Sequence, residues 1–264
     1  MMKDGRFDSG NKLVLFEKEG RLATITLNRP EKLNALNLSL IHEFWQVLEA
    51  IRVDDEISVV LVTGAGKSFS VGADLAFLHS LGSPAQFRKE LKENWHKPFD
   101  AMENMEKLFI AAINGTAIGG GIEMALACDL RVAAKSAGFS MPEIKYGLVP
   151  DAGGTNRLPK LIGAARTKEL VFTGEPITSS EACRVGLVNK VFPDESFMDA
   201  AKAYAQKFLD KSPAALGPGK LLINRSLDLD TSAGLDDVAM LQSILLESEE
   251  YRQAVQAFNE KHKK

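Results

Sequence analysis

Three acidic residues, Glu123, Glu143 and Asp151, stand where they could move protons. Glu123 comes two residues after the triple glycine 119–121, at which a helix is expected to begin. Glu143 lies 20 residues further on (143 − 123), where an apparent strand stops at Pro142. Two carboxyl groups can act as general acid and base when their surroundings separate their pKa values, or when they share a water molecule.

Two of these acids also have an ordinary structural explanation. The dipole of a helix favours an acid in its first turn, which would account for Glu123. Asp151 precedes the segment 152–155, Ala-Gly-Gly-Thr, and could simply cap a helix that follows. The residue types alone leave both explanations open.

Two glycine-containing loops could offer backbone N–H groups to a substrate oxygen. They span residues 68–75 and 114–123, and each follows an apolar run that predicts a buried strand, at 59–62 and at 109–113. Glycine allows a ligand to approach the backbone closely, and the first N–H groups of a helix are unpaired. Two such N–H groups aimed at one carbonyl would stabilise the negative oxygen of an enolate.

The elements that must position these loops follow from the hydrophobic pattern. Strands are expected at 22–27, 57–63, 108–113, 129–133 and 188–192, with a short segment at 139–141. Helices are expected at 40–51, from Ser83-Pro84, from Gly119, at 156–173, and at 178–184. After Phe192, residues 195–210, 214–226 and 234–261 show helical periodicity and little strand signal. The pattern alone predicts an α/β protein with a helical C-terminal region.

The two loops, in this order, resemble the paired motifs of the crotonase (enoyl-CoA hydratase/isomerase) superfamily. Other segments that match in order are 25–30, 34–36, 142–143, 147–155 and 257–258. The resemblance implies a spiral of ββα units over residues 1–194 that carries a CoA-thioester site. It also implies that the helical region, residues 195–264, joins subunits into trimers, often paired as hexamers.

The resemblance further assigns roles to individual residues. The N–H groups of Ala73 and Gly120 would form the oxyanion hole. In the hydratases, two glutamates that match Glu123 and Glu143 flank the α and β carbons of the enoyl thioester, one holding water and one handling the proton. Asp151 stands where hydratases often have glycine, whereas dienoyl-CoA isomerase and 4-chlorobenzoyl-CoA dehalogenase have an aspartate there that acts as proton carrier or nucleophile.

The resemblance implies that contacts with the CoA moiety come largely from backbone groups around Lys32–Leu36 and Ala73–Ala76. The residues implied are Lys32, Ala35, Leu36, Ala73, Asp74, Leu75, Ala76, Gly119 and Gly120, with Lys261 reaching the CoA of a neighbouring subunit. CoA is part of the substrate, so no separate cofactor is expected.

The predicted reaction is the reversible syn addition of water to a 2-enoyl-CoA, with Glu123 and Glu143 sharing the acid and base roles. One alternative is double-bond isomerisation of an enoyl- or dienoyl-CoA, with Asp151 as proton carrier. Another is a non-catalytic acyl-CoA-binding protein on the same fold. The complete set of carboxylates argues against that last alternative, because binding alone needs no acids beside an enolate.

Composition excludes several other classes. Of the 264 residues, 45% are hydrophobic and 25% charged, and the net charge is −3, so no bulk field favours nucleic acid or an anionic membrane. No apolar run approaches the length of a membrane span, and the N-terminal residues lack a signal-peptide core. Cys128 and Cys183 are expected to be core thiols, which fits the cytoplasm. The histidines show no metal-ligand spacing, so no metal site is expected; they are His42, His79, His96 and His262.

Two glycine-containing segments only superficially resemble nucleotide-binding motifs. The segment 62–68 ends in Gly-Lys-Ser, but Leu61 occupies the place of the first glycine of a phosphate loop. The triple glycine would need a further glycine at Met124 to match a dinucleotide-binding fingerprint.

Overall fold

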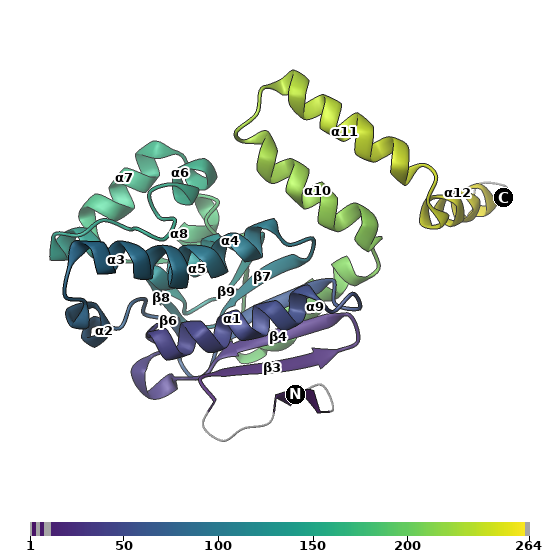
Figure 1. Cartoon of the computed structure of the whole chain (residues 1–264). Coiled ribbons are helices and arrows are strands. Elements are labelled where there is room, and N and C mark those ends of the chain that lie inside the picture. The colour runs from purple at the N-terminus through teal and green to yellow at the C-terminus, as the bar shows by residue number, and fades with distance from the viewer. Residues whose placement is uncertain (1, 4–5, 8–11, 262–264) are drawn as a thin grey trace.

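Two β-sheets form the centre of the molecule (Figure 1). The computed structural model describes residues 2–3, 6–7 and 12–261. A six-stranded sheet has the order β12-β9-β7-β5-β4-β3, and all of its neighbouring strands are parallel except β3 and β4. Its strands are β3 Val14–Glu19, β4 Leu22–Leu27, β5 Val59–Gly64, β7 Leu108–Ile113, β9 Leu130–Ala134 and β12 Lys190–Phe192.

A smaller sheet has the order β11-β10-β8-β6. Its strands are β6 Ser68–Ser70, β8 Thr116–Ile118, β10 Gly138–Ser140 and β11 Ile177–Thr178, and a separate two-stranded pair consists of β1 Met2–Lys3 and β2 Arg6–Phe7. In the chain, β5, β7 and β9 of the large sheet are followed directly by β6, β8 and β10 of the small one. This repetition, with helices between the units, confirms the predicted spiral of ββα units.

Helices surround the sheets and extend beyond them. The α-helices are α1 Leu38–Arg52, α2 Leu75–Ser80, α3 Pro84–Glu90, α4 Lys97–Asn104, α5 Gly120–Leu126, α6 Arg157–Ile162, α7 Ala164–Thr173, α8 Ser179–Arg184, α9 Phe197–Leu209, α10 Pro213–Ser226, α11 Thr231–Leu245 and α12 Glu249–Lys261. A π-helical segment, η2 Leu91–His96, joins α3 to α4, and 3₁₀ turns span η1 Pro30–Lys32, η3 Glu143–Tyr146 and η4 Asp194–Ser196.

The apolar runs that predict buried strands lie at the centre of the core. Every residue of β5 and of β7 is buried, as expected for parallel strands covered on both faces. Helix α1 begins at Asn37, whose side chain accepts the N–H of Leu40, and packs its apolar stripe against β3, β4 and α4. Helix α9 packs across the strands of the same sheet. These elements fix the strand ends from which the two loops emerge.

Several boundaries differ from the sequence-based expectation. The strands β3, β6, β8 and β11 were not expected; three of them have only two or three residues, too few to show a period. The helix expected at 156–173 is broken at Gly163, which has a positive φ of 79°. The helix expected at 234–261 is two helices, α11 and α12, separated at residues 246–248.

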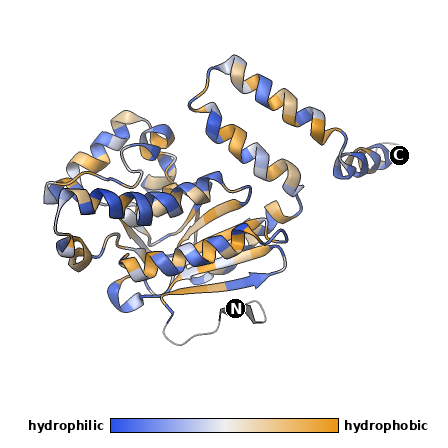
Figure 2. Cartoon of the chain, viewed as in Figure 1, coloured by the Kyte–Doolittle hydropathy of each residue, from blue (hydrophilic) through white to orange (hydrophobic). Residues whose placement is uncertain are grey.

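The C-terminal helices leave the core step by step (Figure 1). Helix α10 is fixed to the core by Lys220, whose Nζ donates to the carbonyls of Met102 (2.6 Å) and Lys107 (2.8 Å) and pairs with Asp129 (3.0 Å). Helix α11 packs against α10 and has no buried residue, although hydrophobic residues lie along its length (Figure 2). Among the described residues, no helix is long and apolar enough to cross a membrane.

Candidate active site

Strand pairing brings the two predicted loops together. The short strands β6 and β8 run parallel, with Ser68 opposite Thr116 and Ser70 opposite Ala117. Both strands therefore end at the same edge of the small sheet. The loop after β6 continues through Gly72 and Ala73, and the loop after β8 continues into Gly119 and α5.

The main-chain N–H groups of Ala73 and Gly120 lie at this meeting point. A Cβ placed on Gly120 would stand 3.6 Å from the nitrogen of Ala73. The backbone N–H of Leu36 donates to the carbonyl of Gly72, and the carbonyl of Leu36 accepts the N–H of Asp74. This pairing flanks Ala73 and leaves the N–H of Ala73 unused. In the described part of the chain, neither Ala73 nor Gly120 donates its N–H to a protein group. The two donors are therefore available to a ligand.

Two glycines make this close approach possible. Gly72 has φ 82°, and a Cβ there would stand 2.7 Å from the carbonyl oxygen of Ile118 and 2.9 Å from the nitrogen of Gly120. Gly119 has φ 50°, and a Cβ there would collide with Oε1 of Glu143. Both positions therefore exclude a side chain by backbone conformation and by space.

Glu123 lies in the first turn of α5, as predicted, and is buried. Its Oε1 accepts the N–H of Ala152 at 2.8 Å and that of Gly154 at 2.9 Å. The pKa of Glu123 is raised to about 8, chiefly by burial and also by the negative charges of Asp151 and Glu143, while the two N–H donors oppose the shift. The carboxyl group is thus fixed in position and takes up or releases a proton near neutral pH.

Glu143 lies beside Glu123's helix because β10 pairs with β8. Ser140 stands opposite Ile118, and the N–H of Gly119 donates to the carbonyl of Ser140 at 3.0 Å. The chain then turns at Pro142, which brings Oε1 of Glu143 against Gly119. Its Oε2 is buried without a hydrogen-bond partner, and burial raises its pKa. An unpaired buried oxygen of this kind favours the protonated carboxyl group or a bound water.

Asp151 does not cap a helix, so that explanation is wrong. Residues 151–156 form turns, and α6 begins only at Arg157, with Asn156 at the cap position and no side-chain cap bond. The segment turns instead to present the N–H groups of Ala152 and Gly154 to Glu123. Asp151 lies at the cavity rim; desolvation by the surrounding protein raises its pKa and the neighbouring His96 lowers it.

A cavity of about 600 Å³ joins all of these groups. Ala73, Gly120, Glu123, Glu143 and Asp151 are among its lining residues. Its other walls are mainly apolar side chains from α2, α3, the π-helical segment and the segment after η3: Leu75, Phe77, Leu78, Leu81, Phe87, Leu91, Trp95, Tyr146, Leu148 and Val149. A cavity of this size, apolar with a few convergent polar groups, suits an acyl chain bound by its thioester.

The residues expected to contact CoA are partly engaged within the protein. Asp74 pairs with Arg29 at 2.6 Å and caps α2, so its carboxylate ties the loop 68–75 to the turn after β4. Leu36 is fully buried, which leaves only its backbone for a ligand. Lys32 and Ala76 are exposed, and Ala35 is half-buried. The side chain of Lys261 lies outside the described residues.

Two further side chains contact this site that were not among the predicted site residues. Trp95 packs over Gly120, with a ring carbon 3.0 Å from where a Cβ would stand. His96 Nε2 lies 2.8 Å from the main-chain oxygen of Asp151. A single aromatic residue or histidine has no diagnostic spacing, so only the packing of the π-helical segment against the site exposes these contacts.

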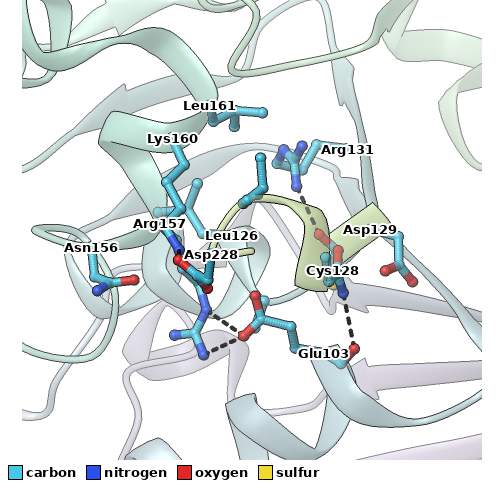
Figure 3. Close-up of a pocket in the computed structure, with 13 residues that line it drawn as sticks. Glu103, Leu126, Cys128, Asp129, Arg131, Asn156, Arg157, Lys160, Leu161 and Asp228 are labelled. Carbon is cyan, nitrogen blue, oxygen red and sulfur yellow. Dashed lines mark hydrogen bonds and ion pairs between the residues drawn. The ribbon is translucent and has the colours of Figure 1, made fainter. Parts of the chain in front are cut away.

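A second hollow, of about 170 Å³, lies between the core and α10 (Figure 3). Its charged side chains are already paired: Arg157 bonds Glu103 through Nε (3.0 Å) and Nη2 (2.8 Å), and Arg131 donates to the carbonyl of Cys128 at 2.8 Å. These paired side chains therefore stabilise the fold. Among the described residues, no group of three His, Cys, Asp or Glu residues could hold a metal ion. Cys128 is a buried thiol as expected, whereas Cys183 is only half-buried.

The ββα spiral and the paired N–H donors beside buried carboxyl groups define the class of protein, and comparison with known proteins agrees. Residues 17–264 match the family model described as enoyl-CoA hydratase/isomerase. The chain is 40% identical over 253 residues to the short-chain-enoyl-CoA hydratase of Clostridium acetobutylicum, with 95% of each protein covered. It is 37% identical over 251 residues to the crotonyl-CoA hydratase of Syntrophomonas wolfei, with 95% of this chain and 96% of the relative covered.

A solved structure gives the same result for the fold. The crystal structure of an enoyl-CoA hydratase from Bacillus anthracis superposes with a TM-score of 0.90 at 34% identity, covering 95% of this chain and 97% of that one. The chain belongs to the enoyl-CoA hydratase/isomerase family, within the crotonase superfamily.

Proposed function

We propose that this protein is an enoyl-CoA hydratase that adds water reversibly to a 2-enoyl-CoA. The observation that carries the proposal is the meeting of two unpaired N–H groups with the buried carboxyl group of Glu123 and the half-buried one of Glu143 in one apolar cavity. The names of the relatives from Clostridium acetobutylicum and Syntrophomonas wolfei point to the same reaction. CoA enters with the substrate, and the proposal requires no separate cofactor.

In this proposal, the thioester oxygen lies between the N–H groups of Ala73 and Gly120. Attack of water at the β carbon pushes the electron pair of the double bond through the α carbon onto that oxygen, which becomes an enolate. Two preorganised donors in a largely apolar cavity stabilise this charge more than they stabilise the neutral substrate.

Glu123 and Glu143 then move the two protons. Glu123 receives two N–H donors, which favour its anion, so it is the better placed to take the proton that the attacking water loses. Glu143 has a buried oxygen without a hydrogen-bond partner, which favours its protonated form, so it is suited to deliver the proton that the α carbon gains. Both groups act from one side of the double bond, which gives syn addition. In the reverse reaction the two roles exchange.

A direct assay tests the proposal. The purified protein should remove the enoyl absorbance of crotonyl-CoA or of a longer 2-enoyl-CoA, and the product should be heavier by one water. Loss of the enoyl absorbance without a mass change would indicate isomerisation, and no reaction with any member of an enoyl-CoA panel would contradict the proposal.

Double-bond isomerisation is the second candidate reaction, because the carboxyl group of Asp151 lines the cavity, caps no helix and could carry a proton there. If hydration is the reaction, the hydratase kcat of Asp151→Asn should stay within about 10-fold of wild type, because Glu123 and Glu143 carry both protons. Asp151→Gly restores the residue common in hydratases and should also hydrate. Loss of turnover in Asp151→Asn at an unchanged thermal midpoint would instead assign Asp151 as a proton carrier.

We further propose that the protein assembles through its C-terminal helices, as the family resemblance implies. On α11 the half-buried side chains Leu241 and Leu245 contrast with Leu235, Met240 and Ile244, which are 62%, 71% and 66% exposed. Exposed apolar side chains in such a row favour a protein partner. The proposed location is the cytoplasm, where the free thiols Cys128 and Cys183 would stay reduced.

Light scattering tests the assembly. At micromolar concentration the mass should correspond to three or six subunits. The paired substitution Leu235→Glu with Ile244→Glu should lower that mass, because each places a charge on the apolar row. The control Glu181→Gln changes a partly exposed side chain of α8, which pairs with Arg184 of the same helix, and should leave the mass unchanged. A wild-type monomer would contradict the proposal.

A further inference from the structure

The carboxyl group of Glu123 is held by a segment that has no regular secondary structure. Within the part of the chain that the structure describes, its Oε1 accepts N–H bonds only from residues 152 and 154, which lie in the turns between Asp151 and Asn156. The orientation of two peptide groups, 151–152 and 153–154, therefore decides where the carboxyl group stands. What fixes these two peptides is thus a question about the chemistry of the site.

A peptide group is planar, and its C=O and N–H point in opposite directions. A donor that binds the carbonyl on one side therefore sets the direction of the N–H on the other. For the 153–154 peptide, the carbonyl of Gly153 accepts the backbone N–H groups of Asn156 (3.1 Å) and Arg157 (2.7 Å). That peptide is fixed by its own turn.

The 151–152 peptide depends on a distant side chain. The carbonyl of Asp151 lies 2.8 Å from Nε2 of His96, 55 residues away in sequence. The N–H of the same peptide, on Ala152, donates to Glu123 at 2.8 Å. His96, one peptide group and Glu123 thus form a continuous chain of hydrogen bonds. Such chains polarise one another, so the bond from His96 also strengthens the N–H as a donor.

His96 is itself rigidly placed. It closes the π-helical segment Leu91–His96, next to the buried Trp95 that packs over Gly120. Leu91 and Trp95 line the acyl cavity, whereas His96 opens onto a separate hollow with Lys92, Lys97 and Asp100. A π-helical segment shifts the register of the side chains that follow it. Neighbouring residues of one segment thereby form the wall of the cavity and support the glutamate.

We propose that His96 is a positioning residue for Glu123, acting through the Asp151–Ala152 peptide. Its Nε2–H donates to the carbonyl of Asp151 and so directs the Ala152 N–H at the carboxyl group. Without that donor the peptide can rotate, and Glu123 loses one of its two fixed bonds. The rate consequence rests on the proposed hydratase function, whereas the effect on the Glu123 carboxyl group does not.

Three substitutions separate the donor from the ring. His96→Phe keeps an aromatic ring without a donor, His96→Gln places an amide N–H at similar reach, and His96→Asn carries an amide that stops short of Asp151. Loss of one neutral hydrogen bond should lower kcat by about 3- to 10-fold in the Phe and Asn variants, with Gln within about twofold of wild type. KM for the enoyl-CoA should stay within about twofold, because His96 does not line the acyl cavity.

The titration of Glu123 supplies a readout that a merely structural role would not move. The Ala152 N–H lowers the pKa of Glu123, so its weakening in His96→Phe should shift the carboxyl titration to higher pH. Carbon-13 NMR of labelled glutamate, assigned by comparison with Glu123→Gln, measures this shift. Glu143 and Asp151 face Glu123 in every variant, and Asp151 also faces His96. If the imidazole acted on the Glu123 titration only through its charge, His96→Gln would shift that titration as His96→Phe does.

The outcomes are distinct. Lower kcat and a raised titration in the Phe and Asn variants, with both restored by Gln, support the proposal. Unchanged kcat and titration in His96→Phe, or a Gln variant as impaired as Phe, would overturn it. If the wild-type protein hydrates no enoyl-CoA, the proposed function fails, and the NMR titration still decides the role of His96.

Discussion

Replacing Glu123 or Glu143 by glutamine is expected to lower kcat for hydration by about 10²- to 10⁴-fold, the usual loss when a positioned acid or base is removed. Glutamine at 123 keeps an amide oxygen that can accept the N–H groups of Ala152 and Gly154, so the turn that holds the side chain should survive. The variant therefore removes proton transfer while it preserves the geometry. Steady-state rates on the best enoyl-CoA substrate measure the loss.

The surface variant Glu181→Gln is a matched control. It makes the same chemical change at a partly exposed side chain of α8 that does not line the cavity, and it should retain full activity. Wild-type rates in both Glu123→Gln and Glu143→Gln would remove these residues from the mechanism. A loss in only one of them would show that a single carboxyl group carries both proton transfers.

Stability supplies a second check on Glu123. Its pKa is raised to about 8 in the folded protein against an ordinary value of 4.5, so the folded state holds this proton over a range in which the unfolded state has lost it. Stability contributed by the group therefore falls as pH rises through this window. Glu123→Gln removes the cost of ionising this buried carboxyl group. The thermal midpoint of the variant, relative to that of wild type, should therefore increase as the pH rises from about 5 to about 9. The site thus trades stability for a carboxyl group that changes charge near neutral pH.

The extent to which the sequence determined this site differs from element to element. The apolar runs within β5 and β7 predict buried strands because four or five consecutive apolar residues need cover on both faces. The triple glycine before Glu123 predicts the helix start that the structure confirms. By contrast, β6 and β8 have three residues each, too few to show a period. Their pairing, which is a tertiary interaction, sets the two loops side by side.

The acids show the same distinction between local and tertiary information. The position of Glu123 in a first helical turn is a local property and was predicted correctly. Asp151 precedes a glycine pair and so has the local appearance of a helix cap, yet the turns after it serve Glu123. His96 has no local pattern at all, since its partner lies 55 residues away. Contacts of this kind depend on packing and cannot be inferred from spacing.

Removing the N–H of Gly120 is expected to lower kcat by about 10²- to 10³-fold, as does the loss of one oxyanion donor in other enzymes. Gly120 is the first residue of α5, a position at which proline fits the helix, and its N–H pairs with no protein group in the described part of the chain. Gly120→Pro therefore deletes the donor with little loss of helix. Binding of a saturated acyl-CoA should weaken much less than kcat, because the donor acts mainly on the developing enolate.

The steric effect of a side chain at residue 120 must be separated from the loss of the donor. A Cβ there would lie 3.0 Å from a ring carbon of Trp95, so Gly120→Ala, which keeps the N–H, measures the cost of that contact. The ratio of kcat between the Ala and Pro variants then gives the effect of the donor. Ala73→Pro tests the opposite donor where a Cβ already exists, and the Leu36 bridge does not use the Ala73 N–H. Because both donors hold one oxygen, the double variant that combines Ala73→Pro with Gly120→Pro should show a smaller fold-loss of kcat than the product of the two single fold-losses. Equal rates in Gly120→Ala and Gly120→Pro, together with an active Ala73→Pro, would place the thioester oxygen elsewhere.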